Sequence, residues 1–197
     1  MPFLTKKSTS KILLANLCYR EGAGEANGRL KELLADEQFG FCAYTEKGLE
    51  PLDSVEVEHF EAGIKYNDNY YNYYAVVRWA NQGKLDARFK DKPFFTDTFY
   101  RTYDGFKKRI GFANNVFYEI DPADSNARDL IDFLRLNNDE LCKQRHNYVN
   151  RMKELFNDDL AKMESYFRSN RTELNFATAL DAAFNSNFFD MIIAKKI

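Results

Sequence analysis

The chain has little proline and glycine, 4 and 9 of its 197 residues. This scarcity excludes a collagen-like repeat and argues against low-complexity linkers. There is no run of about 18 or more apolar residues, so no segment is a candidate membrane span. The first ten residues, MPFLTKKSTS, lack the apolar stretch of a signal peptide. We therefore expect a soluble cytoplasmic protein with no membrane partner.

Cysteine and net charge are scarce as well. Cys18, Cys42 and Cys142 are scattered and odd in number, unlike the disulfide framework of a small secreted protein. The 28 basic and 30 acidic side chains leave a formal net charge of -2. No global positive field therefore draws the chain to nucleic acid, and any such binding must use a local patch.

Aromatic residues, in contrast, are abundant, with 18 Phe, 12 Tyr and 1 Trp. Each can bury roughly 150 to 250 Å² of surface, so a substantial core is available. The hydrophobic pattern predicts an α+β fold with short helices first, strands in the middle and helices in the last third. The expected elements are helices in 10–20 and 28–39 with a loop at 21–28, a strand pair at 55–57 and 75–77, a hairpin in 109–120 turning at Asn114 and Asn115, and helices after residue 124.

Charge is unevenly distributed along the chain. Residues 36–61 hold eight acidic side chains against Lys47 alone, and residues 84–109 hold eight basic against four acidic ones. Such a basic stretch is consistent with a phosphate track, although a solvated face is the commoner reading. The candidate nucleic-acid contacts are Lys84, Arg88, Lys90, Lys107, Lys108 and Arg109.

The pattern with most chemical content starts at Glu58-His59, where a strand-like segment ends. A carboxylate is a hard oxygen ligand for an ion such as Mg²⁺, and an imidazole can accept a proton from water near neutral pH. Taken alone, this pair reads more simply as a structural histidine beside an incidental acid. The spacing adds weight, because Asn72 follows 13 residues after His59 and Asn81-Gln-Gly-Lys84 follows nine residues later.

This spacing resembles the HNH endonuclease superfamily, whose ββα-metal motif has an acidic residue and His, a mid-loop Asn, and Asn-x-x-Lys on a helix. The resemblance implies a metal-dependent endonuclease that hydrolyses phosphodiester bonds of DNA. It implies Glu58 and Asn81 as ligands of Mg²⁺ or Mn²⁺, and His59 as the catalytic base. Asn72 would be a catalytic residue that orients His59, and Lys84 could neutralise a flanking phosphate.

The sequence departs from the family in two ways. Many relatives hold a structural zinc with two Cys-x-x-Cys pairs, but Thr45, Val77 and Ala80 stand in place of three of the four cysteines. We therefore expect no structural zinc and a buried Cys42 thiol. Packing among Tyr44, Tyr73, Val77, Trp79 and Ala80 would compensate. Relatives usually carry Asp where Glu58 stands, and a carboxylate displaced by about 1 Å can cost roughly 100-fold in rate.

The segment 130–141, with Arg145, resembles the helical tail of one HNH subfamily, found in Septu-type and retron-associated bacterial antiphage operons. That resemblance implies a defence effector with an ATPase partner. Two alternatives stay open: a catalytically degenerate HNH-like module that binds a partner protein, and an HNH enzyme directed at RNA. The expected organisation is an N-terminal helical segment (1–38), an HNH ββα-metal core with a basic extension (39–120) and a C-terminal helical region (121–197).

Overall fold

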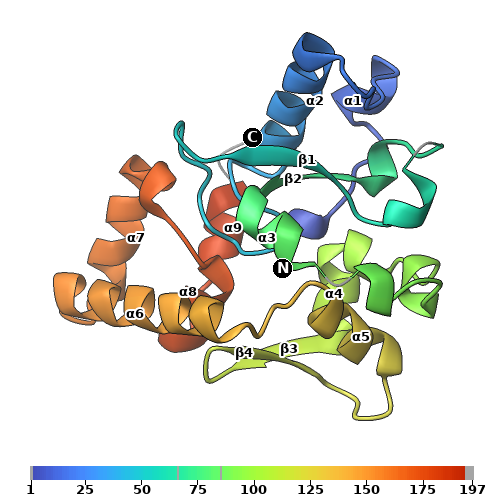
Figure 1. Ribbon diagram of the computed structural model, residues 1–197. Coiled ribbons are helices and arrows are strands. Elements are labelled where there is room, and N and C mark those ends of the chain that lie inside the picture. The colour runs from blue at the N-terminus through green and yellow to red at the C-terminus, as the bar shows by residue number, and fades with distance from the viewer. Residues whose placement is uncertain (1, 66, 85, 194–197) are drawn as a thin grey trace.

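The computed structural model describes residues 2–65, 67–84 and 86–193, and it is a mixed α+β fold (Figure 1). Its helices are α1 (Lys11–Leu14), α2 (Gly24–Glu37), α3 (Arg78–Gly83), α4 (Tyr103–Arg109), α5 (Ser125–Phe133), α6 (Asp139–Phe156), α7 (Leu160–Ser169), α8 (Ala177–Phe184) and α9 (Phe188–Ile193). Its strands are β1 (Val55–His59), β2 (Tyr73–Val77), β3 (Ile110–Ala113) and β4 (Val116–Glu119). They form two antiparallel pairs, β1 with β2 and β3 with β4.

Local signals in the sequence explain several element boundaries. The hydroxyl of Ser10 accepts a hydrogen bond from the backbone N–H of Ile12 and so caps α1. Asn114 and Asn115 both have positive φ, 51° and 65°, as a two-residue type I′ hairpin turn requires. The predicted hairpin in 109–120 is therefore confirmed.

One local prediction is wrong. The Gly-rich stretch 21–28 was expected to be a loop, but Gly24 to Gly28 form the first turn of α2. Glu25 lies in that turn, where a negative charge interacts favourably with the helix dipole. Leu30 and Leu34 are buried on the side of α2 that faces β1 and β2, and this packing outweighs the low helix propensity of glycine.

The β1–β2 hairpin and α3 form a strand–strand–helix unit. Residue 55 pairs with 77, and residue 59 with 73. Helix α3 begins directly after β2 and packs against both strands. In Figure 1, α1 and α2 lie on one side of the hairpin and α3 lies on the other. All five residues of β2 are buried, whereas β1 is only partly buried.

The two faces of the hairpin pack against different apolar clusters. On the α2 face, Tyr73 and Ala75 belong to a cluster with Ile12, Leu30 and Leu34. On the opposite face, Tyr74 and Val76 belong to the largest cluster, which also contains residues of the 89–106 segment and of α5. A third cluster joins Phe3 and Phe41 to the C-terminal helices α6 to α9. Residues from all three predicted segments, 1–38, 39–120 and 121–197, therefore share these clusters.

The loop before β1 is tied to the C-terminal helices by polar contacts. The buried Glu46 carboxylate accepts hydrogen bonds from the backbone N–H of Thr178 at 3.0 Å and from its hydroxyl at 2.6 Å. The backbone carbonyl of Glu46 accepts from the N–H of Phe176, and the Asn175 side chain accepts from the N–H of Gly48. These bonds cap α8 with a residue that lies 132 positions before Thr178 in the chain.

Candidate functional site

The last two residues of β1 point to opposite faces of the hairpin, because side chains alternate along a strand. Glu58 lies opposite Tyr74, and His59 lies opposite Tyr73. His59 therefore lies on the face covered by α2, and Glu58 on the face of the main aromatic core.

The imidazole of His59 is paired with a carboxylate. Its Nδ1 lies 2.6 Å from Oδ2 of Asp68, and the two side chains are 16% and 2% exposed. The rings of Tyr19 and Tyr73 lie edge-on to the imidazole, with centroids at 4.8 and 5.4 Å. Among the described residues, Nε2 of His59 has no hydrogen-bond partner. A carboxylate on Nδ1 favours the tautomer with its proton there, which leaves the Nε2 lone pair available as a base.

Asp68 is itself held in place by two further side chains. The amide Nδ2 of Asn72 donates to Oδ2 of Asp68 at 2.8 Å, and the Tyr73 hydroxyl donates to Oδ1 at 2.7 Å. Asn72 also pairs with both backbone groups of Glu61, accepting from its N–H and donating to its carbonyl. Burial and the hydrogen bond to Asp68 raise the pKa of Tyr73, so its hydroxyl keeps the donated proton. Asn72 thus orients His59 through Asp68.

Asp68 was absent from the sequence-derived candidates. It lies in the polar segment between the two strands, in the run Asn67-Asp68-Asn69, which has the composition of an ordinary turn. An acid nine residues after the histidine carries no motif of its own. Only the return of the chain at β2 brings this carboxylate beside the imidazole.

On the other face, Glu58 is paired with a buried cation. Nζ of Lys84 donates to Oε1 of Glu58, to the carbonyl of His59 at 2.7 Å and to the carbonyl of Phe60 at 3.0 Å. The side chains of Lys84 and Glu58 are only 1% and 5% exposed. Nζ also lies 5.3 Å from the centre of the Phe133 ring. Lys84 was predicted to contact a nucleic-acid phosphate, but here its ammonium lies inside the core.

Asn81 has a different partner from Glu58. Its Nδ2 donates to Oε2 of Glu56 at 2.8 Å, and Oε1 of Glu56 accepts from Nε of Arg78 at 2.6 Å. Glu58 and Asn81 were predicted to share one divalent ion. In this arrangement an ammonium already lies against Glu58, and the Asn81 amide faces another carboxylate.

These residues do not fit the predicted Mg²⁺ or Mn²⁺ site as they are arranged. A second cation beside the Lys84 ammonium would be repelled at short range in a low-dielectric environment. Across the described ranges, no group of three or more His, Cys, Asp or Glu side chains is arranged to hold a metal ion. No catalytic step is therefore assigned to a metal.

The predicted basic patch divides into exposed and engaged residues. Arg88, Lys90, Lys107 and Lys108 are exposed. Arg109 instead makes two hydrogen bonds of 2.6 Å to the carboxylate of Asp124 and another to Asp97. These bonds raise the pKa of Arg109 and lower that of Asp124, first through their mutual hydrogen bonds.

The positions that replace the zinc ligands are buried. Cys42 is a buried free thiol, as expected, and Thr45, Val77 and Ala80 are buried too. Trp79 was expected to join this packing but is 46% exposed, because it lies on the solvent side of α3. The prediction that Trp79 packs with these residues is therefore wrong.

No protein-family model, curated protein or solved structure matches the chain. Among the described residues, no helix is both long and apolar enough to cross a membrane.

Proposed function

We propose that β1, β2 and α3 form an HNH-like ββα unit and that the chain is a nuclease that hydrolyses phosphodiester bonds of DNA. The observation that carries the proposal is the Asp68–His59 pair, with Nδ1 bound to the carboxylate and Nε2 available as a base. The proposal is supported by the order of the elements and by the positions of His59 and Asn72 at the hairpin.

In the proposed reaction, Nε2 of His59 accepts a proton from the attacking water. The water oxygen bonds to phosphorus, the bond from phosphorus to the leaving sugar oxygen breaks, and that oxygen takes a proton from solvent. The Asp68 carboxylate stabilises the imidazolium that forms, and general-base catalysis of this kind contributes about 10²- to 10⁴-fold in rate. Asn72 and Tyr73 are positioning residues, because each acts on the imidazole through Asp68. The exposed Arg88, Lys90, Lys107 and Lys108 are the candidate phosphate contacts.

A second candidate is a catalytically silent HNH-like module that binds a partner protein. The buried Lys84–Glu58 pair favours it, because Glu58 and Asn81 are the residues through which the family resemblance implies metal binding. An antiphage role beside an ATPase subunit is compatible with either candidate and is part of this proposal. In the tail on which that role rests, Arg145 is buried and donates to the carbonyl of Leu136 at 2.7 Å.

The test compares the two histidines of the chain. Purified protein is incubated with plasmid DNA, single-stranded DNA and tRNA, each in buffer with Mg²⁺, with Mn²⁺ and with EDTA. We expect cleavage of plasmid DNA that falls by about 100-fold or more in His59→Gln. His146→Gln is the matched control, since His146 is exposed and lies on α6.

Equal loss of activity in both variants would contradict His59 as the base. Preferred cleavage of tRNA would redirect the proposal to RNA. Absence of cleavage under every condition, with a folded protein, would leave the partner-binding module as the better account.

A further inference from the structure

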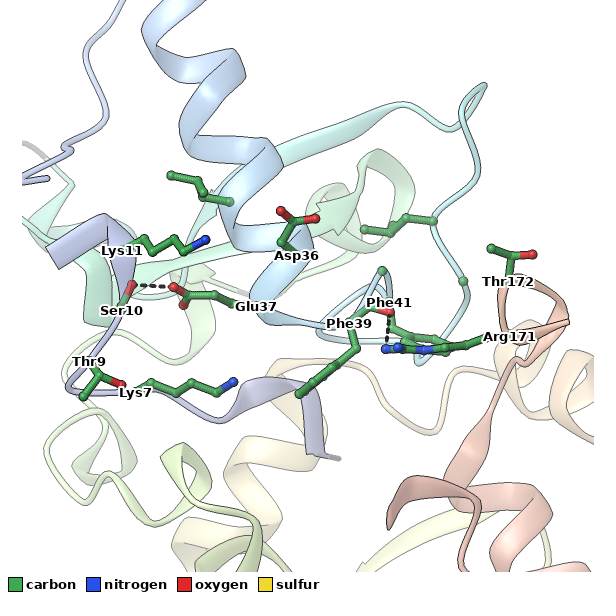
Figure 2. Close-up of a pocket in the computed structure, with 14 residues that line it drawn as sticks. Lys7, Thr9, Ser10, Lys11, Asp36, Glu37, Phe39, Phe41, Arg171 and Thr172 are labelled. Carbon is green, nitrogen blue, oxygen red and sulfur yellow. Dashed lines mark hydrogen bonds between the residues drawn. The ribbon is translucent and has the colours of Figure 1, made fainter. Parts of the chain in front are cut away.

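A cavity of about 740 Å³ lies away from the His59 site, between the N-terminal segment, the end of α2, the 39–49 loop and residues 171–172 (Figure 2). Its volume falls in the range of small-molecule sites, roughly 300 to 1,000 Å³. None of its lining residues belongs to the His59 and Asp68 cluster or to the Glu58 and Lys84 pair. The proposed hydrolysis therefore makes no use of it.

Three cationic side chains line this cavity, together with the two carboxylates of Asp36 and Glu37. Lys7 and Lys11 approach it from the N-terminal segment, and Arg171 approaches from the opposite wall (Figure 2). Within the described residues, none of these three forms an ion pair. Unpaired cations gathered around one concave space favour an anionic ligand.

Arg171 in particular has few partners for a desolvated cation. Its guanidinium donates one hydrogen bond, from Nη2 to the carbonyl of Phe39 at 3.3 Å, and its Nε is buried without a partner. Burial lowers the pKa of Arg171, since desolvation disfavours its charged form. A guanidinium has five N–H donors suited to a planar or tetrahedral oxyanion. A bound phosphate would offset this desolvation.

The acidic residues of the cavity limit how much negative charge it can accept. The Glu37 carboxylate already accepts from the hydroxyls of Ser10 at 2.6 Å and Tyr70 at 2.7 Å. Asp36 lies on the same wall (Figure 2). Carboxylates suit the hydroxyl groups of a sugar better than further phosphates. The charge pattern therefore favours a single phosphate joined to a hydroxyl-bearing group.

Phe39 supplies a flat apolar surface at a conformational cost. It follows α2 with φ of 60°, a left-handed conformation usually occupied by glycine or asparagine. The N–H of Gly40 bonds to the carbonyl of Ala35 and closes the helix end around it. The centre of the Phe39 ring lies 5.0 Å from Nζ of Lys7 and 5.6 Å from the guanidinium carbon of Arg171. A strained aromatic residue in a cavity wall, between two cations, is a feature typical of ligand sites.

We propose that this cavity binds a phosphorylated small molecule of the size of a nucleoside monophosphate. The phosphate is held by Lys7, Lys11 and Arg171, and the apolar part of the ligand lies along Phe39 and Leu33. This inference does not depend on nuclease activity.

The test is isothermal titration calorimetry with three probes: AMP, adenosine and inorganic phosphate. We expect AMP to bind with a Kd below about 1 mM, and adenosine and phosphate each to bind at least about 10-fold more weakly. Arg171→Gln should weaken AMP binding at least about 10-fold. Arg168→Gln is the matched control, because Arg168 is an exposed arginine of α7 outside the cavity.

A second variant, Lys11→Gln, guards against misfolding, since Lys11 is exposed and its replacement leaves the core intact. It should also weaken AMP binding, with an unchanged circular dichroism spectrum. The inference is overturned if AMP does not bind, if adenosine binds as tightly as AMP, or if Arg171→Gln and Arg168→Gln have equal effects. Phosphate binding as tight as AMP binding would overturn the size assigned to the ligand.

Discussion

The two faces of the β1–β2 hairpin handle charge in opposite ways. On one face, the partly exposed His59 is joined to Asp68, and Nε2 of the imidazole has no hydrogen-bond partner among the described residues. On the other, Glu58 is sealed in the core against the Lys84 ammonium, which also reaches two backbone carbonyls. Neighbouring residues of one strand thus differ in role. Glu58 is held in the core by the Lys84 ammonium, and His59 is held at a partly exposed position by the Asp68 carboxylate.

This difference shows how a buried ion pair can link the hairpin to the helix that follows it. The ammonium of Lys84 donates to the Glu58 carboxylate and to the backbone carbonyls of His59 and Phe60. The acceptors come from β1 and the residue after it, and the donor follows α3. The ion pair therefore joins the helix to the strand, and variants on each face should separate structural from chemical effects.

The largest expected effect on stability is at the buried pair of Glu58 and Lys84. Lys84→Met removes a buried ammonium and should lower the free energy of unfolding by about 3 to 5 kcal/mol, as when one partner of a buried pair is deleted. Urea denaturation measures the loss. Lys90→Met is the control, because Lys90 is exposed.

The double variant Lys84→Met with Glu58→Leu should recover much of that stability, since apolar replacement of a whole buried pair is often neutral. A single variant within about 0.5 kcal/mol of the wild type, the range of an ordinary surface change, would show that the pair does not hold α3 to β1.

A smaller effect on stability is expected at the pair of His59 and Asp68. Asp68→Asn keeps the shape of the side chain but removes the charge that faces Nδ1 of His59. We expect a loss of about 1 to 3 kcal/mol in stability, because buried hydrogen bonds to a charged group are lost. If the chain cleaves DNA, the rate should fall far more than this stability change explains.

Glu50→Gln provides the control for Asp68→Asn, because Glu50 is an acidic residue on the surface. Nuclear magnetic resonance of the His59 ring reports its tautomer. An unchanged tautomer in Asp68→Asn would contradict the orienting role of the carboxylate.

Tyr73→Phe should have a milder effect, about 1 kcal/mol, since it removes one hydrogen bond to Asp68 and leaves the ring packing. It should also alter the response to alkaline pH. Because the pKa of Tyr73 is higher in the folded state than in the unfolded chain, its contribution is present below about pH 10 and is lost as pH rises further. The variant should therefore lose stability less steeply above about pH 10, as measured by thermal melts.

The smallest expected effect comes from divalent ions. Because Lys84 lies against Glu58, Mg²⁺ or Mn²⁺ at millimolar concentration should leave the melting temperature of the wild-type chain unchanged. In Lys84→Ala, the same ions should raise the melting temperature, since Glu58 and the carbonyls of His59 and Phe60 are then available to a cation. A Mn²⁺-dependent shift in the wild type that disappears in Glu58→Gln would restore Glu58 as a metal ligand.

The local elements could be predicted from the sequence because their signals are local. Alternating apolar residues marked the strands around Val57 and Ala75, and the Asn114-Asn115 pair marked the tight turn. His59 and Asn72 were also identified as part of one site, whereas Glu58, which was assigned to the same site, lies on the opposite face against Lys84. Asn72 does act on His59, through an intervening carboxylate.

The partners of these residues could not be predicted, since they depend on packing between distant segments. Lys84 resembles any lysine at a helix end, and its burial depends on the Glu58 carboxylate of β1 and on the Phe133 ring, which come from other parts of the chain. Arg109 belongs to a basic run, but Asp97 and Asp124 lie close enough to hold it. Charge patterning gives the number of charges and leaves their pairing open.

The contact between Glu46 and the start of α8 has a consequence for dissecting the protein. Glu46 is buried, and its hydrogen-bond donors, the N–H and hydroxyl of Thr178, come from more than a hundred residues further along the chain. Truncation before residue 175 would leave the buried Glu46 carboxylate without these two hydrogen-bond donors. A minimal fragment that ends after α3 should therefore be degraded rapidly in cells, even though it contains every residue of the hairpin and helix.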